Sequence, residues 1–410
     1  MNFIELGLSK PITDILAEAG YAEPTPIQTK AIPLVLAGRD VVGLAQTGTG
    51  KTAAFGLPII QRLAAERTGL RPGMVRALIL SPTRELAAQI HDNLRRYSRG
   101  QSISTACVVG GVSAHPQRKA LARGVDILVA TPGRLLDLAE QKALSLSAVT
   151  AVVLDEADHM LGLGFIPVIR RIMSMVPAKR QTLLFSATMP KEIRELSNRY
   201  LDRATEISVV PEVATADRVD QRVMHMLPAE KPDALTALVA ARPGARVIVF
   251  TRTKRGADKV AKRLAADGIG ASAIHGNKSQ NNRERTLKAF KSGTAPVLVA
   301  TDIAARGIDV SGVELVVNYE LPNVPEVYVH RIGRTARAGA SGLAVSFCAG
   351  EERDYLRDIE RLIGLRIPTD GDNATASAGW DPLPRAAENK KRPRRRRRRS
   401  GGNRIAAKAA

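Results

Sequence analysis

The chain has 410 residues and a net charge of +21, with 44% hydrophobic and 3% aromatic residues. This length predicts two or three domains, and the hydrophobic content is sufficient for globular cores. The charge indicates a polyanionic partner, because eleven cations follow residue 388 and the preceding residues still carry +10. Scarce aromatic side chains argue against base stacking as the main binding mode and favour contacts to backbone phosphates.

Several protein classes are excluded by the same sequence. No apolar run approaches the roughly 18 residues of a membrane span, and we expect no signal peptide from the first residues. The two cysteines, Cys107 and Cys348, lie far apart in apolar runs, which predicts buried free thiols in a reducing compartment. A structural zinc site is excluded because ligands at finger spacing are missing.

The first predicted element is a short lead-in over residues 1–38. A turn with two prolines, Gly20–Gln28, precedes a helix predicted over Thr29–Leu36. Gln28 carries both a donor and an acceptor and could read an edge of adenine, on which Tyr21 could stack. A turn that caps a helix is an equally good explanation of this stretch.

A glycine-rich loop, Ala45–Thr52, follows the apolar stretch Asp40–Leu44 and precedes a predicted helix. A strand, a glycine turn and Gly-Lys-Thr at a helix start form the pattern of a phosphate-binding loop. Lys51 would reach the β- and γ-phosphates of a nucleotide, and the Thr52 hydroxyl would hold Mg²⁺. The usual first glycine is Ala45 here, and a plain turn with a surface lysine is the alternative.

From residue 40 to about 207, apolar runs alternate with helical segments. This rhythm predicts a parallel sheet covered on both faces, with strands at 40–44, 78–80, 105–109, 126–130, 151–154 and 181–185. Five polar clusters follow the later strands directly. They therefore share one edge of the sheet, where ligands bind in open α/β folds.

After a linker predicted over 208–221, residues 222–366 repeat this rhythm without a second phosphate loop. Strands are predicted at 247–250, 271–274, 297–300, 315–318 and 343–347. The fold class we predict is therefore α/β, with two tandem parallel-sheet domains, 1–207 and 222–366. Residues 367–410 are predicted to be a disordered basic tail, because like charges in series repel and bury nothing.

Two acidic residues, Asp155 and Glu156, follow the strand at 151–154. A carboxylate across from the phosphate loop suits Mg²⁺, and its neighbour could polarise the attacking water. Capping of the next helix by Asp155 is the alternative. The phosphate loop on the same sheet edge favours the catalytic interpretation.

Basic residues recur at the ends of later strands. A helix predicted over Tyr328–Arg337 would place Arg334 and Arg337 on one face, which suits a phosphate clamp supplied by the second domain. A solvated basic face is the alternative. Arg84, Arg134 and Arg252 follow strands beside Thr or Gly and could bind phosphates or merely decorate the surface.

The chain resembles the DEAD-box RNA helicases of superfamily 2 over roughly residues 1–366. Eleven motifs occur in the family's order: Gly20–Gln28, Ala45–Thr52, Pro82–Ala87, Gly110-Gly111, Thr131–Arg134, Asp155–Asp158, Ser186–Thr188, Val247–Arg252, Gln280–Arg283, Ala300–Asp309 and His330–Arg337. The resemblance implies two RecA-like domains. The compact core and basic tail are most similar to the bacterial RhlE-type subgroup.

The resemblance also implies residue roles. The catalytic residues would be Lys51, Glu156, Arg334 and Arg337, and the metal ligands Thr52 and Asp155. ATP would be bound by Tyr21, Gln28, Gln46, Thr47, Gly48, Thr49, Gly50, Lys51, Thr52 and Asp309. Ser186 and Thr188 would couple hydrolysis to strand separation. RNA would be bound by Pro82, Thr83, Arg84, Gly111, Thr131, Arg134, Thr251, Arg252, His275, Gly276, Thr301 and Asp302. Departures from the family pattern are mild: Asn277, Ala336 and the stretch Leu161–Gly164.

We therefore expect an ATP-dependent RNA helicase that uses ATP and Mg²⁺ and separates short duplexes or remodels RNA–protein complexes. The alternative is an ATP-gated RNA clamp or annealing chaperone, which the run Arg394–Arg399 favours because it neutralises phosphates without ATP. The expected partner is single-stranded or short duplex RNA, held by its backbone. Ribosomal or degradation complexes are further candidate partners, no membrane partner is expected, and the protein should act as a cytoplasmic monomer.

Overall fold

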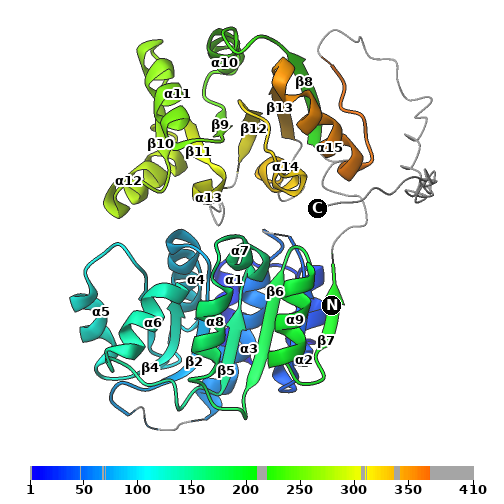
Figure 1. Ribbon diagram of the computed structural model, residues 1–410. Coiled ribbons are helices and arrows are strands. Elements are labelled where there is room, and N and C mark those ends of the chain that lie inside the picture. The colour runs from blue at the N-terminus through cyan, green and yellow to red at the C-terminus, as the bar shows by residue number, and fades with distance from the viewer. Residues whose placement is uncertain are drawn as a thin grey trace, which may run out of the picture. The chain divides into compact units, whose positions relative to one another are not determined.

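The computed structural model describes residues 2–46, 48–66, 69, 71–209, 219–305, 310, 312–336 and 342–369. They form two lobes, each built on one parallel β-sheet (Figure 1). We call residues 2–209 the first lobe and residues 219–369 the second lobe. Most of the predicted linker and nearly all of the predicted tail lie outside the described residues.

The first lobe has a seven-stranded sheet in the order β3-β4-β2-β5-β6-β1-β7, and every pair of neighbours is parallel. Its inner strands are buried along their whole length, which is why they consist of nearly uninterrupted apolar runs. The strands are β1 (Val41–Leu44), β2 (Val75–Leu80), β3 (Thr105–Val108), β4 (Val125–Ala130), β5 (Ala151–Leu154), β6 (Gln181–Ser186) and β7 (Thr205–Ser208).

Helices cover both faces of this sheet. One face packs against α1 (Lys10–Glu18), α2 (Pro26–Leu36), α3 (Lys51–Ala65) and α4 (Arg84–Tyr97). The other packs against α5 (Ala114–Leu121), α6 (Pro132–Glu140), α7 (Ala157–Gly162), α8 (Ile166–Met173) and α9 (Lys191–Tyr200). Apolar side chains at helical spacing form the two cores, so each helix contributes one buried stripe.

The second lobe has a six-stranded parallel sheet in the order β10-β11-β9-β12-β13-β8. Its strands are β8 (Val219–His225), β9 (Arg246–Thr251), β10 (Ala271–Ile274), β11 (Val297–Thr301), β12 (Val313–Asn318) and β13 (Gly342–Cys348). One face packs against α10 (Lys231–Ala240) and α11 (Lys254–Ala266). The other packs against α12 (Gln280–Lys291), α13 (Asp302–Ala305), α14 (Pro325–Ile332) and α15 (Arg353–Ile363), which follows the short 3₁₀ helix Gly350–Glu352.

The predicted fold class is confirmed, and the predicted strands match observed ones within a few residues. Two edge strands, β7 and β8, were not predicted. Three residues of the predicted linker, 219–221, belong to β8, where buried Val219, Gln221 and Val223 alternate with exposed neighbours. That alternation is typical of an edge strand, whereas the sequence analysis attributed it to a linker.

Two further expectations concern bulk properties. No helix among the described residues is long and apolar enough to cross a membrane. Both cysteines are free thiols as predicted; Cys348 is buried and Cys107 only partly buried. Burial raises the pKa of Cys107 to about 12, so this thiol stays protonated and unreactive at neutral pH.

Candidate functional site

The order of strands in the first sheet sorts the sequence motifs into two neighbouring groups. The strands β5, β6 and β1 are adjacent, and their carboxyl ends carry the acidic motif, Ser186 and the phosphate loop. The strands β3, β4 and β2 are adjacent on the other side, and they carry the glycine pair and the two Thr/Arg motifs. The motifs expected to bind a nucleotide and the motifs expected to bind an RNA backbone therefore occupy separate halves of one sheet edge.

The phosphate loop joins β1 to α3 and has the backbone that a phosphate cradle needs. Gly48 and Gly50 have φ values of 88° and 90°, which favour glycine. A side chain on Gly50 would also collide with the Gln28 amide. Lys51 begins α3, is buried, and donates from Nζ to the Ala45 carbonyl at 3.1 Å. Thr49 Oγ1 closes the loop by donating to the Gln46 carbonyl at 2.8 Å.

The lead-in contacts this loop through Gln28, which is fully buried on α2. Its Oε1 accepts from the Thr25 N–H at 2.9 Å, and its Nε2 donates to the Gly50 carbonyl at 3.2 Å. One N–H and one lone pair of the amide remain for a base edge. Tyr21 is partly buried, and its hydroxyl lies 3.0 Å from that of Tyr97. Of the predicted adenine-reading pair, Gln28 therefore contacts the phosphate loop, whereas Tyr21 lies before α2 and contacts Tyr97 of α4.

The acidic pair is buried at the end of β5. Asp155 and Glu156 are 2% and 6% exposed, and Glu156 has a left-handed backbone with φ of 51°. Burial raises the pKa of Asp155 to about 6, although Lys51 opposes the shift. Burial also acts to raise the pKa of Glu156, but its hydrogen bond to His159 and the charge of Lys51 outweigh burial and hold it at about 2. Backbone strain and perturbed pKa values at adjacent carboxyls are typical of functional sites.

A third carboxylate, Asp158, links the acidic motif to the end of β6. The Asp158 N–H donates to Ser186 Oγ at 3.2 Å. Its Oδ2 accepts from both the backbone N–H and the hydroxyl of Thr188, each at 2.9 Å. The two residues predicted to couple hydrolysis to strand separation thus bind Asp158 of α7, the helix that directly follows Glu156.

The other half of this sheet edge carries the predicted RNA contacts of the first lobe. One hollow in the surface has Pro82, Thr83, Arg84, Gly110, Thr131 and Arg134 in its lining. Thr83 caps α4 by accepting from the Leu86 N–H at 3.3 Å. Gly111 has φ of 71°, and the Arg84 guanidinium occupies the place where a side chain would go. Hydroxyls, guanidinium groups and helix N-termini in one hollow suit a phosphate backbone.

The second lobe repeats this arrangement at adjacent strands β10, β11 and β9. Thr251 and Thr301 are buried at strand ends. His275 Nδ1 accepts from the Asn277 N–H at 3.3 Å, and its Nε2 lies 3.0 Å from Asp258 Oδ2. The ring is therefore held in one orientation beside the exposed Gly276.

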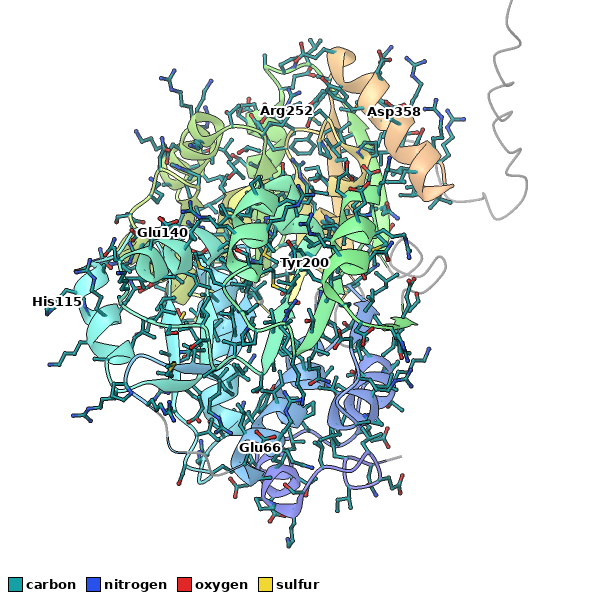
Figure 2. All side chains as sticks on the ribbon, turned by 60° about the horizontal axis from the view of Figure 1, so that its bottom comes forward. Glu66, His115, Glu140, Tyr200, Arg252 and Asp358 are labelled. Carbon is teal, nitrogen blue, oxygen red and sulfur yellow. The ribbon has the colours of Figure 1, made fainter. Side chains whose placement is uncertain are left out.

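Arg252, labelled in Figure 2, follows β9, and its backbone N–H donates to Glu320 Oε2 at 2.7 Å. Its guanidinium lies over the Tyr355 ring, 5.8 Å from the centroid. Asp302 is held by Arg331, which donates from Nε to Oδ1 at 2.5 Å and from Nη2 to Oδ2 at 2.8 Å. This bidentate pair gives Asp302 an intramolecular partner, and any RNA contact by Asp302 remains a prediction.

The helix predicted over Tyr328–Arg337 ends earlier, and that prediction was wrong. α14 stops at Ile332, Gly333 caps it, and Arg334 N donates to the Arg331 carbonyl in a following turn. Arg334 is buried and its Nε donates to the His330 carbonyl at 3.3 Å. Arg337 lies outside the described residues, as do Thr47 and Asp309, so the predicted shared face of the two arginines does not exist on α14.

Sequence reasoning missed four functional side chains. His159, Asp158 and Glu320 hold predicted site residues through the hydrogen bonds given above or, for His159, through Nδ1 at 3.2 Å from Glu156 Oε2. Arg331 is almost fully buried and binds Asp302, Asn318 and the Glu320 carbonyl. Asp158 and Arg331 lay inside quoted motifs. No periodicity marks His159 or Glu320, because their partners are set by the fold.

The residues at the β1–β5–β6 edge fit a magnesium nucleotide. A cradle that only glycine backbones allow, a buried lysine, a threonine and a buried carboxylate offer the donors and oxygen ligands that phosphates and Mg²⁺ require. Among the described residues, no group of three or more His, Cys, Asp or Glu could hold a metal alone. The remaining ligands of a Mg²⁺ at this edge would be phosphate oxygens and water, as is usual for this ion.

Comparisons with known proteins cover both lobes. The chain matches the family description DEAD/DEAH box helicase over residues 25–196 and Helicase conserved C-terminal domain over residues 230–339. It is 44% identical over 367 residues to the ATP-dependent RNA helicase CshA of Limosilactobacillus reuteri, covering 90% of this chain and 73% of the relative. Identity to CshA of Streptococcus pneumoniae serotype 4 is 46% over 367 residues, covering 90% and 69%.

Solved structures agree with these relatives. The S. cerevisiae protein Dbp5 bound to RNA and ADP BeF3 has a TM-score of 0.81 at 31% identity, covering 90% of this chain and 95% of that one. Mss116 bound to ssRNA and UDP-BeF has a TM-score of 0.82 at 29% identity, covering 90% and 79%. The two parallel-sheet lobes therefore share the fold of RecA-like helicase structures.

Proposed function

The chain belongs to the DEAD-box family of ATP-dependent RNA helicases, and from this premise we propose how its own residues perform ATP hydrolysis and RNA remodelling. Tyr21 and Gln28 hold adenine, and the Gln46–Thr52 loop holds the phosphates with Lys51 on the β- and γ-phosphates. Thr52 and Asp155 would hold Mg²⁺, which neutralises phosphate charge when bound. The hydrogen bond from Gln28 to the Gly50 carbonyl supports a coupling between recognition of the base and recognition of the phosphates.

Glu156 orients the attacking water in this proposal. Because its pKa is held near 2, the carboxylate is ionised at neutral pH and accepts a hydrogen bond from water. Such an acid is a poor store for a proton, so its main contribution is positioning and charge stabilisation. The left-handed backbone of Glu156 fixes the direction from which this side chain enters the site.

In this proposal, RNA binding and ATP hydrolysis are coupled through Asp158, which lies in the acidic motif and contacts Ser186 and Thr188. We propose that the first-lobe hollow and the β9–β11 end of the second lobe hold one RNA backbone. Binding of ATP and RNA draws the lobes together, and the bent strand loses its partner strand. Arg334 and Arg337 then reach the γ-phosphate with Asp309 nearby, while Asp158, Ser186 and Thr188 report the nucleotide state to the RNA side.

The observation that carries this proposal is the placement of nucleotide motifs on β5-β6-β1 and RNA motifs on β3-β4-β2 of one sheet. The test is steady-state ATP hydrolysis with matched RNA and DNA oligonucleotides. We expect RNA to stimulate hydrolysis strongly and DNA weakly. Equal stimulation by both, or none by either, would contradict the proposal.

The basic tail favours a second activity, RNA annealing without ATP, because its cations neutralise phosphates. Truncation before Asn389 separates the two activities. We expect RNA affinity and its salt dependence to fall while the turnover at saturating RNA is unchanged. Loss of turnover at saturating RNA would show that the tail does more than tether RNA.

We further propose the subgroup, the oligomeric state and the partners of the protein. The RhlE-type subgroup rests on the compact core and basic tail, whereas the relatives compared above carry the name CshA. Action as a cytoplasmic monomer and association with ribosomal or degradation complexes rest on the family resemblance. The domain limits 1–207, 222–366 and 367–410 likewise remain predictions, except that the second sheet begins at Val219 of β8, inside the predicted linker.

A further inference from the structure

The solvent face of α11 carries three positively charged side chains, Arg255, Lys259 and Lys262, which we call the α11 stripe. Their spacing of four and three residues places them on one face of the helix, opposite the buried Ala257, Val260 and Leu264. All three side chains are exposed. None of them has an ion pair within the part of the chain that the structure describes.

The neighbouring cations of the same helix are different, because each has an acceptor. Lys254 Nζ donates to Asn277 Oδ1 at 2.8 Å. Arg263 binds Asp233 and Asp267, each at 3.0 Å. The stripe is therefore not explained by the packing of α11 against the rest of the lobe.

The last helix of the lobe shows what an ordinary solvated face looks like. α15 carries cations at the comparable positions Arg353, Arg357 and Arg361, but Asp354 and Asp358 lie between them. Arg357 pairs with Asp354, and Arg361 donates to Asp358 at 2.7 Å (Asp358 is labelled in Figure 2). The arginines Arg357 and Arg361 of α15 are thus neutralised by carboxylates of their own helix, whereas the three cations of the stripe have no ion pair among the described residues.

The position of the stripe links it to the RNA contacts proposed for the second lobe. α11 begins two residues after Arg252, and two of its side chains hold the loop after β10. Lys254 contacts Asn277, and Asp258 contacts both His275 and Lys278 at about 3 Å. An RNA held at Arg252, His275 and Gly276 would therefore lie at the N-terminal end of α11. The stripe extends from that end along the helix.

The chemistry of the stripe selects double-helical RNA over a single strand. A single strand is usually bound along a cationic groove, whereas the stripe lies on the convex surface of a helix. Duplex RNA is bound mostly through its shape and phosphates. We propose that the α11 stripe binds the phosphate backbone of a duplex that flanks the RNA held at Arg252, His275 and Gly276. This inference rests on the function proposed above.

The test compares two RNAs of equal single-stranded sequence, one of which continues into a short duplex. The stripe variant is Arg255→Gln/Lys259→Gln/Lys262→Gln in the full-length chain. The matched control, Arg353→Gln/Arg357→Gln/Arg361→Gln, removes the same charge from α15 in the same lobe. Thermal unfolding confirms that each variant is folded, and RNA-stimulated ATP hydrolysis gives the apparent RNA affinity at several salt concentrations.

We expect the stripe variant to bind the duplex-flanked RNA about tenfold more weakly, with a salt slope smaller by about 2–3 because three phosphates lose their cations. Its affinity for the single strand should match that of the α15 variant. Equal losses on both RNAs, or equal effects of both variants, would overturn the proposal. Unchanged binding of both RNAs would also overturn it. If RNA fails to stimulate the unmodified protein, the proposed function itself fails instead.

Discussion

The two sheets of this protein have the same strand order apart from the additional edge strand β7, yet the lysine that begins the helix after the first strand has different partners in the two lobes. Lys51 begins the helix after β1, and Lys231 begins the helix after β8 at the equivalent place. Lys51 has one backbone acceptor, the Ala45 carbonyl, and two buried carboxylates nearby. Lys231 is closed in by Glu352 Oε2 at 2.5 Å and by the Tyr319 carbonyl at 2.9 Å.

The carboxylate of Glu352 gives Lys231 an internal anionic partner at 2.5 Å. Its oxygens also accept from the backbone N–H groups of Leu321 and Ala349, each at 3.0 Å. Buried N–H groups and a lysine are thus satisfied from within the chain. The comparison shows that the lysine after the first strand is neutralised by an internal glutamate in the second lobe, which also lacks the glycine loop, whereas Lys51 begins the helix after such a loop.

The largest effect should be the loss of ATP hydrolysis when Lys51 or Glu156 of the first lobe is replaced. Lys51→Ala should lower RNA-stimulated ATP hydrolysis by at least about a hundredfold, because the phosphates lose their cation. Glu156→Gln should do the same by removing the group that orients water. Steady-state phosphate release measures both, and persistence of hydrolysis in both variants would refute the assignment of the first lobe.

The second lysine should matter to the fold instead. Lys231→Met removes the nearest cation of the buried Glu352 and leaves it only the Arg252 guanidinium at 4.0 Å, so the free energy of unfolding of the lobe should fall by about 3–5 kcal/mol. Denaturant titration measures the loss. The double variant Lys231→Met/Glu352→Gln should recover part of it, and a Lys231 variant as stable as the unmodified chain would contradict the comparison.

The buried Asp155 should lower the free energy of unfolding of the first lobe at neutral pH. Burial raises the pKa of Asp155 to about 6, above 3.8 for an exposed aspartate, so the unfolded chain ionises first as the pH rises. Stability therefore falls between about pH 4 and pH 6, and Asp155→Asn should raise the free energy of unfolding at pH 7 by on the order of 1–3 kcal/mol.

Thermal unfolding without nucleotide or metal tests this expectation. The gap between Asp155→Asn and the unmodified chain should close as the pH is lowered towards 4, while the variant hydrolyses no ATP at any pH. A gap that does not change with pH would mean that Asp155 is not the group that carries the cost. Stability gained at the expense of activity is common at catalytic sites.

The smallest effect concerns how each lobe makes left-handed turns. The phosphate loop uses glycines at positive φ, but the turn after α14 uses Ala336 with φ of 54°. Ala336→Gly should stabilise the chain by about 0.5–1 kcal/mol, because alanine is strained there. The control Ala241→Gly, at φ of −68°, should destabilise it by a similar amount. Equal effects of the two variants in thermal unfolding would contradict this reading.

Much of the fold followed from the sequence because buried parallel strands are uninterrupted apolar runs, as in β2, β4 and β5. The edge strands β7 and β8 did not, since half of their residues face solvent and resemble a linker. The glycine loop and the acidic pair were predictable because phosphate binding demands those residue types in order. The end of α14 at Ile332 and the partners of Asp302 and Glu352 were not, because contacts between distant elements decide them.

The central claim is that the first lobe alone grips the nucleotide, while the second lobe supplies an arginine needed only for hydrolysis. Arg334→Gln tests it most directly when ATP binding and hydrolysis are measured on the same preparation with saturating RNA. The account predicts wild-type affinity for ATP together with a loss of hydrolysis of at least about a hundredfold. Retained hydrolysis, or ATP binding weakened as much as hydrolysis, would contradict it.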